Sequence, residues 1–282
     1  MYKQYEILKK REIAPNTYSM DIYAPLVARR TMPGQFIILR VDERGERIPL
    51  TSADWDREQG WVQIVFQAVG ASTKMLAGME PGMCLKDFAG PLGKPSRLKE
   101  INRAVCIGGG VGTAVVYPSV KWLFETGRKV DVIIGARSED FLIFEEDIRK
   151  RCNHLYITTD DGSKGRKGFV TDQLKELLDA GNEYDEVIAI GPMPMMKFVA
   201  ALTKKYGLKT TVSLNPLMVD GTGMCGCCRV TVGDEIKYAC VDGPEFDGHL
   251  VDYDEAINRQ RVYMDEECEK THQCRLEGAL ND

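Results

Sequence analysis

The feature that most constrains the fold is a change of hydrophobic period at Arg103. From there to Leu214, short apolar segments alternate with longer segments of helical period. Strands separated by helices of this length predict βαβ units and a parallel sheet over residues 99–214. The expected strands are Ala104–Ile107, Val130–Ala136, Leu155–Thr158, Glu186–Ile190 and Thr210–Leu214, and the expected helices are Thr113–Thr126, Phe144–Arg151, Val170–Ala180 and Pro194–Tyr206.

Residues 1–98 follow a different pattern and are expected to form a small antiparallel barrel. Six β-rich segments are separated by turn sequences such as Met32-Pro33-Gly34 and Glu80-Pro81-Gly82. Short strands with this punctuation are typical of closed all-β structures. The expected strands are Tyr5–Arg11, Thr17–Tyr23, Phe36–Val41, Ile48–Ala53, Trp61–Gln67 and Met83–Phe88, with one helix inserted at Ala71–Ala77. The predicted fold class is therefore α/β plus all-β, with a third, small domain at 215–282.

That third domain contains a cysteine-rich loop with a defined spacing. Asp220, Cys225, Cys228 and Cys240 are arranged as D-x4-C-x2-C-x11-C, and a hairpin over 229–239 lies between the last two. Plant-type [2Fe–2S] ferredoxins hold their cluster with C-x4-C-x2-C and a distant fourth Cys. The spacing predicts a [2Fe–2S] cluster bound by these four side chains, with a carboxylate in place of the first thiolate.

The sequence also allows other roles for the cysteines. Cys225, Cys227, Cys228 and Cys240 could instead hold one zinc ion or be inert buried thiols. Neighbouring side chains in extended backbone point to opposite sides, so Cys227 and Cys228 suit one tetrahedral ion poorly. We expect Cys227 to pack beside the cluster without binding iron. Cys268 and Cys274, with His272, form a weaker metal candidate in the polar tail.

The parallel sheet carries glycine-rich sequence where its first strand should meet a helix, at Gly108-Gly-Gly-Val-Gly-Thr113. Glycines there allow a pyrophosphate close to the backbone and to the helix N-terminus. Two more strand ends should face the same crevice, because ligands bind beyond the carboxyl ends of parallel strands. The predicted nicotinamide-cofactor residues are Gly109, Gly110, Val111, Gly112 and Thr113, then Ala136, Arg137, Ser138 and Glu139, then Gly191, Pro192 and Met193.

The second of these strand ends bears on the choice between NAD and NADP. An acidic residue there favours a free ribose 2′-hydroxyl, whereas a cation favours a 2′-phosphate. Glu139 and Asp140 favour NAD(H), and Arg137 leaves NADP(H) open. A solvated loop without ligand contacts is the alternative for this segment.

Composition limits the possible partners. The net charge is −5 and the sequence has no basic stripe, so no nucleic acid partner is expected. No apolar run approaches the roughly 20 residues that span a bilayer, and the N-terminus lacks the apolar segment of a signal peptide. Nine unevenly spaced Cys do not form a disulfide framework. We therefore expect a cytoplasmic protein with reduced thiols and no membrane contact.

A nicotinamide transfers two electrons as hydride, whereas a [2Fe–2S] cluster accepts one at a time, so a flavin is expected between them. The order of barrel, nucleotide-binding fold and ferredoxin-like loop resembles the ferredoxin–NADP reductase superfamily, and within it electron-transfer subunits like that of dihydroorotate dehydrogenase. Three further segments carry the resemblance: Arg47-Ile-Pro-Leu-Thr51, Gly90-Pro-Leu-Gly93 and Ala239-Cys-Val-Asp-Gly-Pro-Glu-Phe246.

The resemblance implies FAD in the barrel. The superfamily motif R-x-[YF]-[ST] falls on Ile48–Thr51, where Ile48 and Leu50 replace its Arg and its aromatic residue, so Arg47 becomes the candidate phosphate contact. It places Pro49, Leu50 and Thr51 beside the isoalloxazine and Gly90 at the closing turn of the barrel. It also implies that the segment containing Val69, Gly70, Ser72 and Thr73 offers N–H groups and hydroxyls to the pyrophosphate.

The resemblance also implies a function and partners. The chain would exchange hydride between NAD(H) and FAD and single electrons between FAD and the cluster, without a side-chain acid or base. In one branch of the superfamily the partner is a larger flavo-iron–sulfur subunit with a second FAD and [4Fe–4S] clusters, which binds NADPH. That complex also uses ferredoxin and performs electron bifurcation. The alternatives are an electron-transfer subunit of dihydroorotate dehydrogenase, sulfide dehydrogenase or sulfhydrogenase, and a redox sensor without turnover.

Overall fold

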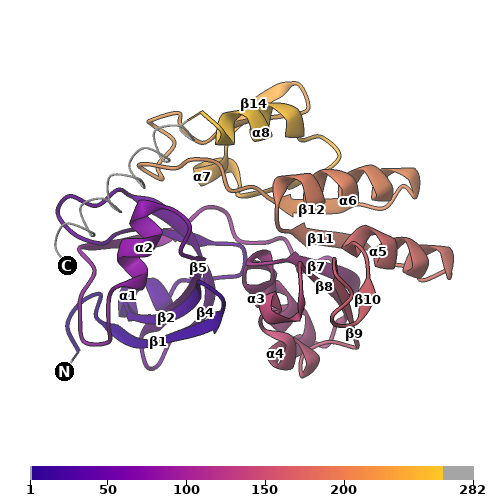
Figure 1. Ribbon diagram of the computed structural model, residues 1–282. Coiled ribbons are helices and arrows are strands. Elements are labelled where there is room, and N and C mark those ends of the chain that lie inside the picture. Colours follow the sequence, from indigo (N-terminus) through magenta and orange to yellow (C-terminus); the bar gives the residue numbers. More distant parts are fainter. Residues whose placement is uncertain (1, 263–282) are drawn as a thin grey trace.

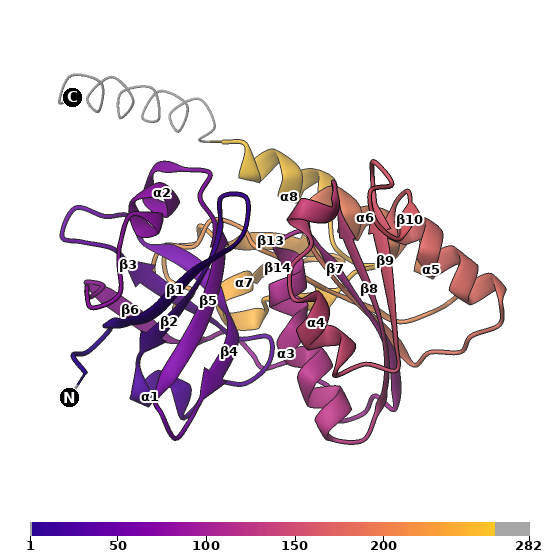
Figure 2. The ribbon, with the colours of Figure 1, turned by 60° about the horizontal axis from the view of Figure 1, so that its bottom comes forward.

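The computed structural model describes residues 2–262, which form a barrel, a seven-stranded sheet domain and a C-terminal segment (Figure 1). The barrel and the sheet domain lie side by side, and the C-terminal segment packs over both (Figures 1 and 2). Among these residues, no helix is both long and apolar enough to cross a membrane.

The barrel is a six-stranded antiparallel sheet in the order β1-β2-β5-β4-β3-β6. It closes where the Ile7 N–H donates to the Met83 carbonyl at 2.8 Å and the Leu85 N–H donates to that of Tyr5 at 3.0 Å. Buried apolar side chains such as Met20, Ile64 and Phe66 fill it. Its elements are β1 (Ile7–Ala14), β2 (Thr17–Tyr23), α1 (Pro25–Ala28), β3 (Phe36–Arg40), β4 (Ile48–Asp56), β5 (Trp61–Gln67), α2 (Ala71–Ala77) and β6 (Asp87–Leu92).

The sheet domain has the strand order β10-β9-β8-β7-β11-β12-β15, parallel except for β15. Its central strands are buried on both faces because α3 and α4 cover one face and α5 and α6 the other. The order reverses between β7 and β11, the position where such sheets bind ligands. The elements are β7 (Arg103–Gly109), α3 (Gly112–Glu125), β8 (Lys129–Ala136), the 3₁₀ turn η1 (Glu139–Phe141), α4 (Glu145–Arg149), β9 (His154–Thr159), β10 (Arg166–Lys167), α5 (Val170–Asp179), β11 (Glu186–Ile190), α6 (Met193–Lys205) and β12 (Thr210–Ser213).

The C-terminal segment is attached to both other parts. Its strand β15 pairs with β12 and so becomes the edge strand of the seven-stranded sheet. The sequence analysis did not predict this strand. The buried Cys228 and Cys240 share one apolar core with Phe36 and Ile38 of the barrel. The elements are β13 (Arg229–Val232), β14 (Glu235–Tyr238), α7 (Ala239–Asp242), β15 (Glu245–Asp247) and α8 (Tyr253–Gln260).

Glu245 of β15 lies where the three parts meet. The Ser96 hydroxyl donates to its Oε1 at 2.7 Å. A Cβ at Gly34 in the barrel would come within 2.9 Å of the same oxygen, so the junction is tightly packed. Burial raises the pKa of Glu245 to about 7, and the Glu186 carboxylate adds to the increase while the Ser96 hydroxyl opposes it.

This junction predicts a pH dependence of stability. The folded protein holds the Glu245 proton more tightly than the unfolded chain, so stability should fall as pH rises from about 4.5 to about 7. We expect Glu245→Gln to flatten this range and to raise the free energy of unfolding at pH 8 by at most about 3 kcal/mol. Urea unfolding at pH 5 and pH 8 measures it. Equal destabilisation at both pH values would show that the carboxyl is already ionised in the folded protein.

Candidate functional site

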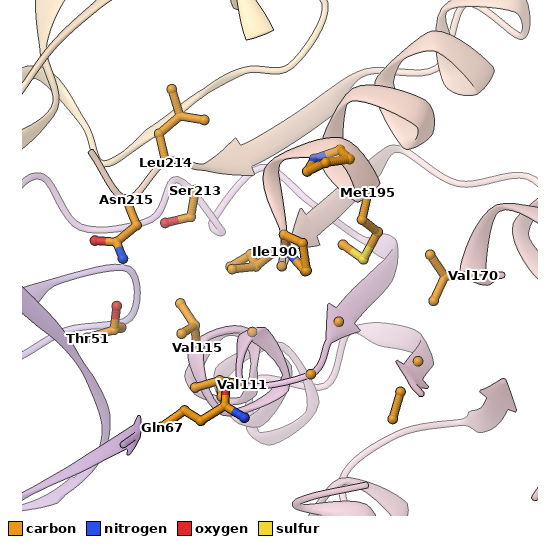
Figure 3. Close-up of a pocket in the computed structure, with 18 of the residues that line it drawn as sticks. Thr51, Gln67, Val111, Val115, Val170, Ile190, Met195, Ser213, Leu214 and Asn215 are labelled. Atoms are coloured by element: carbon orange, nitrogen blue, oxygen red, sulfur yellow. The ribbon is translucent and has the colours of Figure 1, made fainter. Parts of the chain in front are cut away.

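A cavity of about 1560 Å³ lies between the barrel and the carboxyl ends of the parallel strands. Figure 3 shows Thr51 and Gln67 of the barrel facing Val111 and Val115 at the start of α3. Ser213, Leu214 and Asn215, which end β12 and follow it, border the same space (Figure 3). The predicted residues that line the cavity are Pro49, Leu50, Thr51, Val69, Thr73, Gly109, Gly110, Val111, Gly112, Ala136, Arg137, Gly191 and Pro192.

Other predicted cofactor residues do not line the cavity: Arg47, Gly70, Ser72, Gly90, Thr113, Ser138, Glu139 and Met193. Packing explains several of them. Thr113 is 2% exposed and lies beneath Gly108, whose Cβ would be 2.6 Å from the Thr113 Cα. Met193 is buried in the core at the start of α6. A Cβ on Gly90 would come within 2.6 Å of the Ile37 side chain.

The loops after β7 and β11 approach each other backbone to backbone. A Cβ on Gly112 would lie 2.3 Å from the Ile190 carbonyl oxygen, and one on Gly109 would lie 2.4 Å from the Met195 sulfur. Gly110 differs because its φ is +54° and no atom lies within 4 Å of the position that a Cβ would take. The first two glycines thus bring the loops together, while Gly110 leaves open space beside a left-handed backbone. A dinucleotide pyrophosphate needs such an approach.

After β8, the structure places the two charged residues that bear on the choice between NAD and NADP, Arg137 and Glu139, in different surroundings. Arg137 is exposed and lines the cavity. Glu139 does not: its carboxylate pairs with Lys164 Nζ at 3.2 Å, and its N–H donates to the Ser163 hydroxyl at 2.7 Å. Asp160, which directly follows β9, is an acidic residue that does line the cavity. Position on the strand end alone did not distinguish these residues.

The flavin segment lies on β4, where Pro49 and Thr51 pair with Ile38 and Phe36 of β3. Thr73 at the start of α2 takes a role that the sequence analysis did not foresee. Its Oγ1 accepts from the N–H groups of Val69 and Gly70 at 3.1 Å each, so these donors are already satisfied within the turn. The Ser72 hydroxyl donates to Glu46 Oε2 at 3.0 Å.

Several cavity residues were missed from sequence. They include Gln67, Asp160, Phe169, Lys175, Phe198 and Asn215, whose side chains are polar or aromatic. Asn215 could have been found, because it directly follows the predicted strand Thr210–Leu214 at the edge where ligands bind. Phe169 is 64% exposed immediately before α5, where a large apolar side chain in the open is a signal for a binding role.

The predicted cluster ligands lie in a loop that touches the barrel. A Cβ on Gly221 would come within 2.8 Å of the Ile38 side chain and 2.7 Å of that of Leu92. Gly221, Gly223 and Gly226 all have positive φ, which lets the loop turn tightly. The tail candidates Cys268, Cys274 and His272 lie outside the described residues.

Two of the four ligand candidates form a close pair of thiols, and the other two are linked by a hydrogen bond from a backbone N–H to a carboxylate. Cys228 Sγ and Cys240 Sγ lie 3.2 Å apart and are each 1% exposed. Asp220 Oδ2 accepts from the Cys225 N–H at 2.8 Å, and Oδ1 accepts from the Thr222 N–H at the same distance. Over residues 2–262, no three His, Cys, Asp or Glu side chains are placed to hold one metal ion. The close pair of thiols suits one iron of a two-iron cluster, because each iron takes two protein ligands.

The protonation preferences of these groups differ with their surroundings. The N–H groups of Thr222 and Cys225 lower the pKa of Asp220. The pKa of Cys225 is also lowered, chiefly by the N–H of Cys227. Burial raises the pKa of Cys240 to about 12. Because iron binds the thiolate, the lowered pKa of Cys225 favours binding at the exposed end, whereas Cys240 at the buried end must release a proton as metal enters.

Comparisons with known proteins agree with this geometry. Residues 106–201 match the family described as the oxidoreductase NAD-binding domain. Residues 215–252 match the iron–sulfur cluster binding domain of dihydroorotate dehydrogenase B. The second match includes all four predicted ligands and the strand β15.

Whole-chain relatives extend these matches. An electron transfer subunit homolog of dihydroorotate dehydrogenase B (NAD(+)) from Thermotoga maritima is 44% identical, covering 93% of this chain and 92% of the relative. The electron transfer subunit from Fusobacterium nucleatum is 33% identical, covering 83% and 92%. A Clostridium beijerinckii protein described as uncharacterized, from the adh 3′ region, is 57% identical over 93% and 92%.

Solved structures have the same fold. One chain from the structure of an NADH-dependent reduced ferredoxin–NADP oxidoreductase, a study of flavin-based electron bifurcation, is 42% identical, with a TM-score of 0.92 over 97% of this chain and 98% of that one. An Amycolatopsis cytochrome P450 reductase is 22% identical, with a TM-score of 0.61 over 71% and 64%, and shares the fold alone.

Proposed function

The chain belongs to the family of dihydroorotate dehydrogenase B electron transfer subunits, and we propose that it is the small subunit of an NADH-dependent reduced ferredoxin–NADP oxidoreductase. As an oxidoreductase subunit of this family it has an NAD-binding domain and an iron–sulfur domain. The finer assignment is supported by the likeness to the oxidoreductase structure over nearly the whole of both chains. The sequence feature that accompanies this finer assignment is Asp220, which stands at the position of the first cysteine ligand.

One observation supports electron transfer within the chain most directly. Phe36 lines the large cavity and also belongs to the apolar core that contains Cys228 and Cys240. The cavity wall and the buried end of the cluster loop therefore belong to one continuous apolar core. When bound, FAD converts the two-electron chemistry of a nicotinamide into the one-electron chemistry of an iron–sulfur cluster.

The chain's own residues would bind and orient these groups. We assign Pro49, Leu50 and Thr51 to the flavin ring, because they line the cavity from a strand fixed by its pairing with β3. Gly109–Gly112 would hold the nicotinamide cofactor's pyrophosphate at the start of α3. NAD(H) remains the proposed cofactor on the strength of the relatives, with Arg137 as the cationic side chain that would have to accommodate a 2′-phosphate if NADP(H) bound.

A larger subunit is proposed to receive electrons at the cluster loop. Met224 within the loop is 88% exposed, and Leu217, three residues before Asp220, is 49% exposed, so the loop region carries exposed apolar side chains. The proposed partner carries a second FAD and [4Fe–4S] clusters, binds NADPH and exchanges electrons with ferredoxin, and the complex bifurcates electrons. The free thiols of the described residues suit a reducing cytoplasm.

A second candidate is the electron-transfer subunit of a dihydroorotate dehydrogenase itself. It is favoured by the match of residues 215–252, whose family description names that enzyme. The two candidates differ in their partner: one oxidises dihydroorotate, and the other reacts with NADPH and ferredoxin.

The deciding experiment is isolation of the chain with whatever co-elutes, followed by flavin, iron and sulfide quantitation. We expect one FAD and about two irons per copy of this chain beyond those of the partner, and loss of visible absorbance when NADH is added. A preparation that oxidises dihydroorotate and ignores NADPH would identify the second candidate. A chain that contains iron but no flavin, and that NADH does not reduce, would contradict both and leave a redox sensor.

A further inference from the structure

Arg47 does not reach the cavity that its sequence neighbours line. Ile48, Pro49, Leu50 and Thr51 all border it, but the Arg47 side chain turns to the cluster loop. Its Nε donates to the Val219 carbonyl at 2.7 Å, across 172 residues of sequence. This contact joins the strand expected to orient the flavin to the residue that immediately precedes Asp220.

Arg47 shares its acidic partner with a second arginine. Its Nη1 lies 4.0 Å from Asp87 Oδ2, and the same carboxylate oxygen accepts from Arg40 Nε at 2.7 Å. Two guanidinium groups thus share one carboxylate. The Arg47 side chain is 33% exposed, so its field on the loop is reduced by solvent but not removed.

The loop at this point is held in two ways. Gly221 packs directly on Ile38 and Leu92 of the barrel. The Asp220 carboxylate fixes the turn through the N–H groups of Thr222 and Cys225. Arg47 adds a third restraint one peptide before Asp220, where it orients the backbone that presents the ligand.

We infer that Arg47 is a positioning residue for the iron–sulfur loop and is not a phosphate ligand of FAD. This inference rests on the proposed function. Reduction adds a negative charge to the cluster, and a nearby cation stabilises that state. Arg47 therefore raises the reduction potential of the cluster while it holds the loop on the flavin strand.

The test compares Arg47→Gln and Arg47→Lys with the wild-type complex. We expect Arg47→Gln to keep the wild-type FAD content, to shift the cluster's midpoint potential downward in a potentiometric titration, and to change its electron paramagnetic resonance spectrum. Arg47→Lys keeps the charge and should restore part of the potential. The matched control is Arg44→Gln, which removes an equal charge from an exposed position three residues earlier.

Three results would overturn the inference. Loss of FAD from Arg47→Gln with an unchanged cluster spectrum and potential would make Arg47 a flavin ligand. An unchanged potential and spectrum in Arg47→Gln, or a shift of equal size in Arg44→Gln, would remove its positioning role. All three differ from failure of the proposed function, which would appear as wild-type protein without flavin or iron before any variant is compared.

Discussion

Cys228→Ala is expected to purify with at most about a tenth of the wild-type iron at the cluster site. Changes around metal ligands already lower metal affinity roughly 10- to 100-fold, and removal of a ligand should cost at least as much. Cys228 lies 3.2 Å from Cys240 at the buried end of the loop, so no exposed thiol can easily replace it. Iron and sulfide quantitation, with the visible spectrum of the purified chain, measures the loss.

Burial of Cys228 requires a control for packing. Cys106→Ala removes an equally buried thiol from β7, away from the cluster loop, and should lower stability while retaining iron. Cys227→Ala tests the spacing argument, since Cys227 lies between two predicted ligands and should also retain iron. If Cys227→Ala lost iron and Cys228→Ala kept it, the ligand assignment would be wrong.

Much of the fold could be predicted because the hydrophobic periodicity and the Gly- and Pro-containing turn sequences indicate the same element boundaries. The helix at Ala71–Ala77 was predicted at its observed bounds, and so was the strand Glu186–Ile190. The last barrel strand was expected at Met83–Phe88 but is β6, at Asp87–Leu92. Residues 83–85 form only an isolated bridge with Glu6 and the hydrogen bonds that close the barrel. Their apolar pattern therefore belongs to the closing contact of the barrel and not to a regular β-strand.

Other features depend on contacts between distant residues, which local pattern cannot encode. Strand β15 has only three residues and joins the sheet because the cluster loop returns the chain to the edge of β12. Arg47 was predicted from its place next to a motif, and Glu139 from its position at the end of a strand. The structure shows a distant partner for each, the Val219 carbonyl for Arg47 and Lys164 for Glu139. Motif position located the right segments, but competing partners decided which side chains reach the cavity.

Gly110→Ala should weaken NADH binding about 10-fold or more, which corresponds to about 1.4 kcal/mol. Its φ of +54° and the open space beside it allow a pyrophosphate to lie against the backbone. A methyl group would occupy that space and would also strain the left-handed backbone by roughly 1 kcal/mol. Titration of NADH against the flavin-loaded chain measures the affinity, and urea unfolding measures the strain.

Gly207→Ala separates the two effects. Gly207 has a φ of +62°, no atom lies within 4 Å of its Cβ position, and it is not among the residues that line the cavity. It should therefore lose a similar amount of stability, about 1 kcal/mol, and bind NADH as the wild type does. If both variants weakened binding equally, backbone strain would be the cause. If neither did, the pyrophosphate would lie elsewhere in the cavity, and the glycine sequence after β7 would serve only to pack α3 against the sheet.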